Sequence, residues 1–195
     1  MKEISEKTIL RQKILDKRER IPVKDRSEMS DIIFEKLSGV PEYKNASTIL
    51  FFVNYRSEVI TSPYIKKLLE EGKKIYCPRV EGMDITFFGI GSMDDLKPGY
   101  QGIPEPAENE LKRYTKSMQN NDTVIIVPGS VFDRNGNRMG YGKGFYDRFL
   151  KRYDKLFKIA PCYDMQIYDG EIPIDENDIR MDMIVSERQV IRIHE

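Results

Sequence analysis

Residues 127–150, VPGSVFDRNGNRMGYGKGFYDRFL, decide the fold prediction, because they join an apolar run to a helix through a glycine-rich loop. Glycine allows positive φ angles and lets a ligand approach main-chain N–H groups closely. Such a loop at a helix N-terminus is typical of an anion site, since unpaired N–H groups and the helix dipole face the ligand. Arg138 and Lys143 add positive charge, and Asp133 and Asp147 add possible metal ligands. The stretch predicts a phosphate-binding loop, with an ordinary surface loop as the alternative.

Strands and helices alternate along the rest of the chain. The apolar runs at 122–129 and 47–53 predict buried strands. The helical segment 61–71 leads from the latter to a strand at 73–80, an order typical of a parallel sheet with a right-handed crossover. We therefore predict one α/β domain over residues 1–195, with a mostly parallel central sheet flanked by helices on both faces. Further strands are expected at 84–90, 155–164 and 182–195, and further helices at 3–20, 22–39 and from 144.

Composition excludes several classes of protein. The 32 basic and 32 acidic residues cancel, so bulk attraction to nucleic acid or to a membrane surface is not indicated. No apolar run approaches the roughly 20 residues of a membrane span, and the charged N-terminus lacks a secretory signal. Cys77 and Cys162 lie far apart, as expected of reduced thiols, and the one histidine, His194, nearly excludes a histidine triad or a multi-histidine zinc site. We expect a cytoplasmic monomer.

Two segments outside the loop contain candidate ligand contacts. Lys7, Arg11, Ile14 and Arg18 fall on one face of the first helix, so basic residues lie beside an apolar stripe. Either these side chains extend to water along their stems, or Lys7 and Arg11 face an anion held elsewhere. Glu58 follows the strand at 47–53, on the edge where parallel sheets bind ligands, although a solvated loop carboxylate is the alternative.

Two common glycine motifs do not fit the loop. The P-loop requires G-x-x-x-x-G-K-[ST], but Gly142 and Lys143 are followed by Gly144, and Asn137 stands where the first glycine should be. A dinucleotide fingerprint requires G-x-G-x-x-G directly after a strand, whereas these glycines lie about ten residues past one. The pattern that remains is RMGYGKGFYD, residues 138–147.

This pattern resembles the 5-formyltetrahydrofolate cyclo-ligases, also called methenyltetrahydrofolate synthetases. Their pattern is close to P-G-x-x-F-D-x-x-G-x-R-[LM]-G-x-G-x-G-[YF]-Y-D. It is filled in register by Pro128, Gly129, Phe132, Asp133, Gly136, Arg138, Met139, Gly140, Gly142, Gly144, Phe145, Tyr146 and Asp147. The resemblance extends to Lys7 and Arg11, Glu58, Pro78 and Arg79, residues 102–106, and ENDIRMD ending at Asp182. Asn177, often histidine in bacterial members, and Phe145, more often tyrosine, depart from the pattern without removing a charge.

The resemblance implies an ATP- and Mg²⁺-dependent reaction that converts 5-formyltetrahydrofolate to 5,10-methenyltetrahydrofolate and releases ADP and phosphate. In the implied route the γ-phosphoryl group moves to the formyl oxygen, N10 attacks the formyl carbon, and phosphate leaves as the ring closes. Phosphoryl transfer asks the protein mainly for positioning and charge neutralisation. The partners are therefore two small molecules, a reduced folate and ATP.

The same resemblance implies a set of site residues. Lys143 and Arg138 are the expected catalytic residues, and Asp147 and Asp182 the expected Mg²⁺ ligands. ATP is expected to contact Lys7, Arg11, Arg138, Met139, Gly140, Tyr141, Gly142, Lys143, Gly144, Phe145 and Tyr146. The folate is expected to contact Val53, Glu58, Tyr141, Gly142, Lys143, Gly144 and Phe145.

Several alternatives remain open. Asp147 could only complement the helix dipole, and Asp182 could only pair with Arg180. Asp133 is expected to brace the loop by bonding main-chain N–H groups, and Gln101 could belong to a lid. One alternative function is a catalytically silent folate- or nucleotide-binding protein on the same scaffold. Another is a sugar-phosphate isomerase or acyl-CoA transferase, but we find no signature of the enolising base or glutamate nucleophile that these need.

Overall fold

A seven-stranded sheet forms the centre of the molecule, with the strand order β12-β11-β9-β6-β1-β2-β3. The computed structural model describes residues 5–193. β1, β2, β6, β9 and β11 run parallel, while β3 and β12 pair antiparallel at the two edges. The strands are β1 Thr48–Phe51, β2 Lys74–Glu81, β3 Asp84–Ile90, β6 Thr123–Ile126, β9 Phe157–Pro161, β11 Met183–Val185 and β12 Val190–Arg192. The predicted mostly parallel sheet is confirmed.

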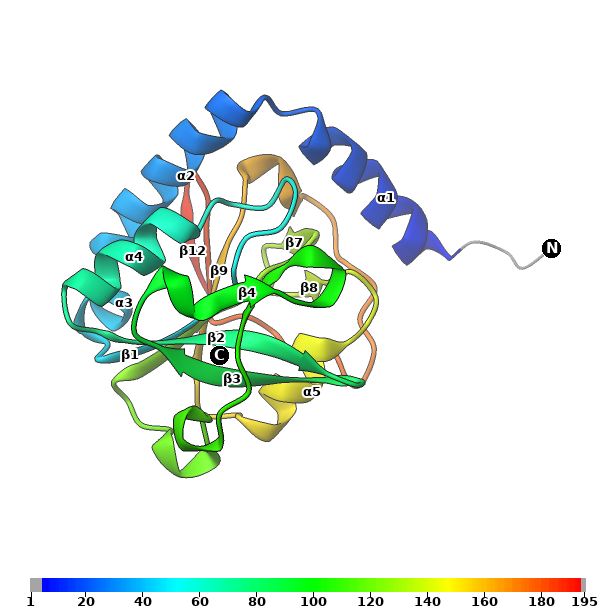
Figure 1. Ribbon diagram of the computed structural model, residues 1–195. Coiled ribbons are helices and arrows are strands. Elements are labelled where there is room, and N and C mark those ends of the chain that lie inside the picture. Colours follow the sequence, from blue (N-terminus) through cyan, green and yellow to red (C-terminus); the bar gives the residue numbers. More distant parts are fainter. Residues whose placement is uncertain (1–4, 194–195) are drawn as a thin grey trace.

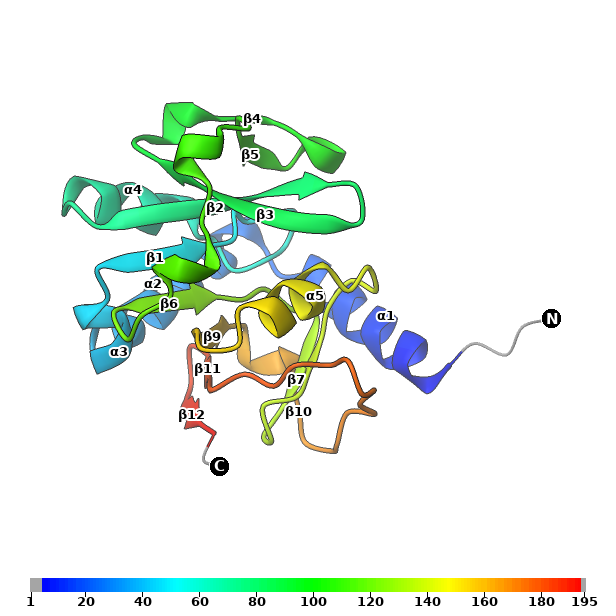
Figure 2. The ribbon, with the colours of Figure 1, turned by 90° about the horizontal axis from the view of Figure 1, so that it is seen from below.

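Helices cover both faces of this sheet, as predicted. The helices are α1 Glu6–Glu19, α2 Val23–Ser38, α3 Pro41–Asn45, α4 Ser62–Glu70 and α5 Phe145–Arg152. α4 connects β1 to its parallel neighbour β2. The helices α2, α3 and α4 lie together beside the sheet, whereas α1 extends away from them towards the N-terminus (Figure 1). With the molecule turned, α5 lies in front of the sheet and α2 lies behind it (Figure 2), in agreement with their separate cores.

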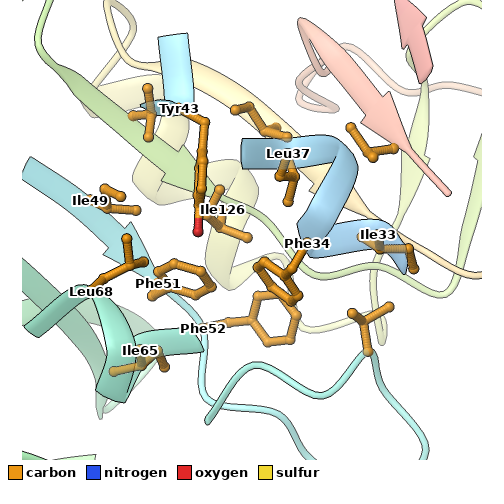
Figure 3. Packing of buried hydrophobic residues seen from close by; sticks show 14 of the residues in the cluster. Ile33, Phe34, Leu37, Tyr43, Ile49, Phe51, Phe52, Ile65, Leu68 and Ile126 are labelled. Carbon is orange, nitrogen blue, oxygen red and sulfur yellow. The ribbon is translucent and has the colours of Figure 1, made fainter. Parts of the chain in front are cut away.

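Alternating residues of β1 supply two separate cores. Ile49 and Phe51 pack with Ile33, Phe34 and other buried residues of α2, α3 and α4, as Figure 3 shows. Leu50, between them in sequence, packs on the opposite face with residues of α5 and β3. Since successive strand residues point to opposite faces, a strand that is apolar throughout needs cover on both sides. This explains why the apolar run at 47–53 contains no alternation.

Two small sheets lie outside the predicted elements. They are a three-stranded sheet in the order β10-β7-β8 and a β4-β5 hairpin. Their strands have two or three residues each, within segments rich in Gly and Pro, so no periodicity could develop. The bounds are β4 Leu96–Pro98, β5 Pro104–Pro106, β7 Val131–Asp133, β8 Arg138–Met139 and β10 Ile167–Tyr168. The 3-10 turns are η1 Met93–Asp95, η2 Tyr100–Gly102, η3 Glu110–Lys112, η4 Lys116–Met118 and η5 Asp164–Gln166.

The first helix begins later than predicted, at Glu6, because Ser5 caps it by accepting the N–H group of Thr8. Residues 3 and 4 of that prediction, and His194, lie outside the described residues. Between residues 5 and 193, we find no helix with both the length and the apolar composition needed to cross a membrane.

Candidate active site

A cavity of about 790 Å³ opens beside the carboxyl ends of β1 and β6. Phe52 and Val53, just past β1, and Pro128, just past β6, line it. β1 and β6 are the neighbours at which the strand order reverses, since β2 follows β1 on one side and β9 follows β6 on the other. Ligands of open α/β sheets bind at such a reversal, outside the carboxyl ends of the strands.

One face of α1 forms a wall of this cavity. Its lining residues Lys7, Arg11 and Arg18 are spaced by four and seven positions, which places them on one helix face. The Lys7 ammonium donates to Asp175 at 2.7 Å and to Asp178 at 2.9 Å, and both carboxylates also line the cavity. Burial acts to lower the pKa of Lys7, yet the two carboxylates together raise it above its ordinary value. The basic face of the helix therefore turns inward.

The glycine-rich loop forms another wall, because residues 138–147 all line the cavity. Gly142 has a φ of +90°, and a Cβ at this position would lie 3.5 Å from the Arg11 guanidinium. Gly144 is the N-cap of α5 and has a φ of +64°, a left-handed conformation that other residues rarely adopt. These glycines let the loop turn closely around the basic residues and into the helix.

Arg138 and Asp147 form a nearly buried ion pair within this wall. The guanidinium donates to the Asp147 carboxylate at 2.5 Å and to the main-chain oxygen of Pro128 at 3.2 Å. The Nε atoms of Arg138 and Arg11 are buried without a hydrogen-bond partner in the described structure. Buried donors without partners are costly, so two such donors on two walls of one cavity favour an anionic ligand there.

Lys143 differs from Lys7, Arg11, Arg18 and Arg138 of this cavity because it is exposed. Its ammonium makes no hydrogen bond or ion pair with any residue from 5 to 193, within 3.5 and 4.0 Å respectively. Its main-chain oxygen accepts a hydrogen bond from Arg148 at 3.0 Å, which ties the loop to α5. The side chain is thus available to a ligand.

Glu58 is a buried carboxylate on the β1 side of the cavity, only 6% exposed. One oxygen accepts the Tyr141 hydroxyl at 2.8 Å and the other accepts the Tyr55 N–H group at 2.8 Å. Burial raises the pKa of Glu58, while Arg18, the Tyr55 N–H group and Tyr141 act in the opposite direction. The alternative of a solvated loop carboxylate is therefore wrong.

Comparison with known proteins identifies the family. Its sequence model, described as the 5-formyltetrahydrofolate cyclo-ligase family, matches residues 3–187. The 5-formyltetrahydrofolate cyclo-ligase of Mus musculus is 30% identical over 193 residues, covering 94% of each chain. The chain belongs to the 5-formyltetrahydrofolate cyclo-ligase family.

Two further relatives extend this result. The NMR structure of 5,10-methenyltetrahydrofolate synthetase from Aquifex aeolicus matches with a TM-score of 0.84 at 35% identity, covering 97% of this chain and 93% of that one. An Arabidopsis thaliana relative named "5-formyltetrahydrofolate cyclo-ligase, mitochondrial" is 30% identical over 191 residues, covering 86% of this chain and 69% of its own. The chain is thus a ligase of folate one-carbon metabolism, and its α/β fold is that of a cyclo-ligase.

All but one of the predicted site residues of this cyclo-ligase line the cavity. They are Lys7, Arg11, Val53, Glu58, Arg138, Met139, Gly140, Tyr141, Gly142, Lys143, Gly144, Phe145, Tyr146 and Asp147. The exception is Asp182, whose carboxylate accepts the main-chain N–H group of Lys158 at 2.6 Å and its ammonium at 2.9 Å. Lys158 lies near the start of β9, whereas the cavity opens at the other ends of the parallel strands.

Asp182 therefore lies apart from the other predicted site residues, and its role as a Mg²⁺ ligand stays a prediction. Asp178, four residues earlier in the same ENDIRMD segment, lines the cavity instead. Burial acts to raise the pKa of Asp178, but the Asp175 N–H group and Lys7 lower it below its ordinary value. The alternative pairing of Asp182 with Arg180 is wrong, because Arg180 donates to Asn137 and Asp182 binds Lys158.

Two other expectations concerned Asp133 and Gln101. Asp133 is buried and accepts the main-chain N–H groups of Asn135, Asn137 and Ile172 at 2.9 to 3.0 Å, so its bracing role is confirmed. Gln101 lines the cavity from the turn between β4 and β5. Gln101 and Arg56 are the two residues other than glycine with positive φ in the described chain, at 53° and 50°, and both line this cavity. Such strained conformations are concentrated at functional sites.

Proposed function

We propose that this cyclo-ligase couples ATP to ring closure by transferring the γ-phosphoryl group to the formyl oxygen of 5-formyltetrahydrofolate. The formyl oxygen attacks the γ-phosphorus while the bond to the bridging oxygen breaks, and ADP leaves. N10 of the folate then attacks the formyl carbon and loses its proton, and phosphate leaves as the ring closes. The proposal is supported by one observation above all: a single cavity holds both unpartnered guanidinium donors and a buried carboxylate acceptor.

The phosphate end of the reaction is assigned to the α1 face and the glycine-rich loop. Arg11, Arg138 and Lys143 carry the positive charge that phosphoryl transfer needs, and the loop supplies main-chain N–H groups. Arg138 is held by Asp147 and Pro128, so its guanidinium is fixed before a ligand arrives. Lys143 has no such partner and is the charge that can follow the γ-phosphoryl group.

The folate ring is assigned to the side of the cavity with Val53 and Glu58. Each Glu58 oxygen accepts one hydrogen bond from the protein, and an ionised carboxylate has about four lone-pair sites. One site on each oxygen therefore remains for N–H donors of the pterin. Tyr146 connects the two ends, since its ring lies 5.9 Å from the Arg138 guanidinium and burial beside Glu58 raises the pKa of its hydroxyl.

Mg²⁺ fits this cavity as a companion of ATP. In residues 5–193, no group of three or more His, Cys, Asp or Glu side chains is placed to hold a metal. Mg²⁺ commonly binds one or two carboxylates and takes its other ligands from phosphates and water. Asp147 and Asp178, which both line the cavity, would hold it, whereas Asp182 binds Lys158 outside the lining residues. When bound, Mg²⁺ would neutralise charge on the ATP phosphates.

The direct test is to mix the purified protein with 5-formyltetrahydrofolate and Mg·ATP and to follow the near-ultraviolet absorbance of the methenyl product. We expect one ADP per product and no product when ATP is omitted. Calorimetry with each ligand alone gives the matched control. Binding of both ligands without any product would refute the proposed reaction and leave a silent binding protein.

We also propose a monomer in a reducing compartment, the cytoplasm. Cys77 and Cys162 are both unpaired and buried, as expected where disulfides do not form. Light scattering during size-exclusion chromatography tests the monomer, with a mass near 22.8 kDa as the expected result. Subcellular fractionation tests the location, because the mitochondrial form of a relative makes an organelle the competing result.

A further inference from the structure

Arg18 is the largest side chain among the fully buried residues, at 2% exposure, although it lies on a helix that borders an open cavity. Arginine is rarely buried to this degree unless it is paired. Yet no carboxylate of residues 5–193 lies within 4.0 Å of its guanidinium, the limit for an ion pair. Of the two alternatives for basic residues on this helix, extension to water is therefore wrong for Arg18.

The guanidinium joins three separate segments around the cavity. Nε donates to the Ser57 hydroxyl at 3.1 Å, beside Glu58, and Nη1 donates to the main-chain oxygen of Gly129 at 3.2 Å. Nη2 donates to the Tyr141 hydroxyl at 2.5 Å. Because that hydroxyl accepts from Arg18, its own proton is directed to Glu58, which it reaches at 2.8 Å. The result is a continuous hydrogen-bonded chain from Arg18 through Tyr141 to Glu58.

We infer that Arg18 is a positioning residue for folate binding, which holds Tyr141 against Glu58 and supplies the buried positive charge that keeps this carboxylate a hydrogen-bond acceptor. The inference rests on the proposed role of Glu58 as acceptor for the pterin. A guanidinium in a fixed fork suits this task because it can hold a backbone oxygen, a serine and a phenol at once. Arg18 itself reaches the folate only through Tyr141 and Glu58.

Charge supports the same assignment. Burial raises the pKa of Glu58, and Arg18 is the first of the groups that oppose this rise. Glu58 is faced by Arg18 from α1, Tyr141 from the glycine-rich loop and Tyr146 from α5, and the Tyr163 hydroxyl donates to its main-chain oxygen at 3.1 Å. Burial raises the pKa of all three tyrosines, so they stay neutral through the range in which Glu58 titrates.

Removal of the Arg18 charge should therefore shift the protonation of Glu58 to higher pH. Nearby opposite charges lower a carboxyl pKa by about 1 to 3 units, and their loss reverses that shift. A protonated Glu58 loses acceptor sites for the pterin. Below its midpoint, affinity should fall about tenfold for each pH unit.

The experiment measures calorimetric binding of 5-formyltetrahydrofolate to the full chain between pH 5 and 9, without ATP. We expect the pH midpoint of binding in Arg18→Gln to lie about 1 to 3 units above that of the wild type. Arg18→Lys, which keeps the charge but not the fork, should restore the midpoint while binding more weakly. Glu58→Gln should bind weakly at every pH, which assigns the midpoint to Glu58. Arg20→Gln, which removes an exposed charge just past the same helix, should match the wild type.

An unshifted midpoint in Arg18→Gln would overturn the inference. If that variant does not fold, Tyr141→Phe tests the hydrogen-bonded part of the inference, because it keeps the Arg18 charge and removes the hydroxyl that joins Arg18 to Glu58. The Tyr141 side chain is 45% exposed. A raised midpoint in Tyr141→Phe supports the inference, and an unchanged one overturns it. Failure of the proposed function looks different, because the wild type would then form no methenyl product whatever its binding.

Discussion

Replacement of Lys143 by Ala should separate catalysis from stability more cleanly than any other change in the cavity. The side chain is exposed, and its ammonium has no partner among residues 5–193. Its loss should therefore change the free energy of unfolding by no more than about 0.5 kcal/mol. If Lys143 contacts the γ-phosphoryl group only in the transition state, kcat should fall by about 10² to 10³, which corresponds to roughly 3 to 4 kcal/mol.

Two measurements on the same protein samples are needed. Initial rates of methenyl formation at saturating folate and Mg·ATP give kcat. The urea concentration at the midpoint of unfolding reports the stability of each variant. Lys155→Ala is the matched control, because Lys155 is exposed near the end of α5 and does not line the cavity. Lys143→Arg keeps the charge and should recover part of the lost rate.

An unchanged kcat in Lys143→Ala would refute the assignment of this residue to the transferred phosphoryl group. A rise in the folate KM alone, with kcat unchanged, would also refute it, because that pattern reports equal binding in the ground and transition states. Equal losses in the Lys143 and Lys155 variants would show only a general effect of surface charge.

Three further predictions concern the metal, the loop and the core. Asp178→Asn should raise the Mg²⁺ concentration for half-maximal rate about tenfold or more, since one of two carboxylate ligands is lost, whereas Asp182→Asn should leave it unchanged. Mg²⁺ titrations with the reverse order would assign the second metal ligand to Asp182. Asp133→Asn should lower the free energy of unfolding by about 1 to 3 kcal/mol, because an amide nitrogen would face main-chain donors. An unchanged midpoint of urea unfolding would count against the bracing role. Leu37→Ala should lower the free energy of unfolding by about 2 to 5 kcal/mol and leave kcat unchanged, since Leu37 is fully buried in the core away from the cavity.

The glycine-rich loop and its neighbours could be predicted from sequence because their signals are local. The strand at 122–129, the loop and the helix after it are consecutive, and each carries its own pattern. The parallel order followed from one strand–helix–strand unit, and the position of Glu58 followed from the rule for carboxyl ends of strands. For these elements sequence order and spatial order coincide.

Contacts between distant segments could not be predicted in the same way. The residues ENDIRMD include two candidate aspartates, and no local pattern distinguishes Asp178, which faces Lys7, from Asp182, which faces Lys158. The helical spacing placed Arg18 on the inward face of α1, but its hydrogen-bond partners Ser57, Gly129 and Tyr141 are 39, 111 and 123 residues away. Burial of a charge depends on such distant partners.

The pairing of Lys7 with Asp178 bears on how the enzyme is made. The two residues are 171 positions apart in the chain. At a synthesis rate of about 5 to 20 residues per second, Lys7 waits roughly 10 to 30 s before its partner exists. A nascent chain can therefore contain the glycine-rich loop and the first helix while the part of the cavity formed by the Lys7–Asp178 pair is still missing. Ligase activity should begin only once Asp178 has left the ribosome and paired with Lys7.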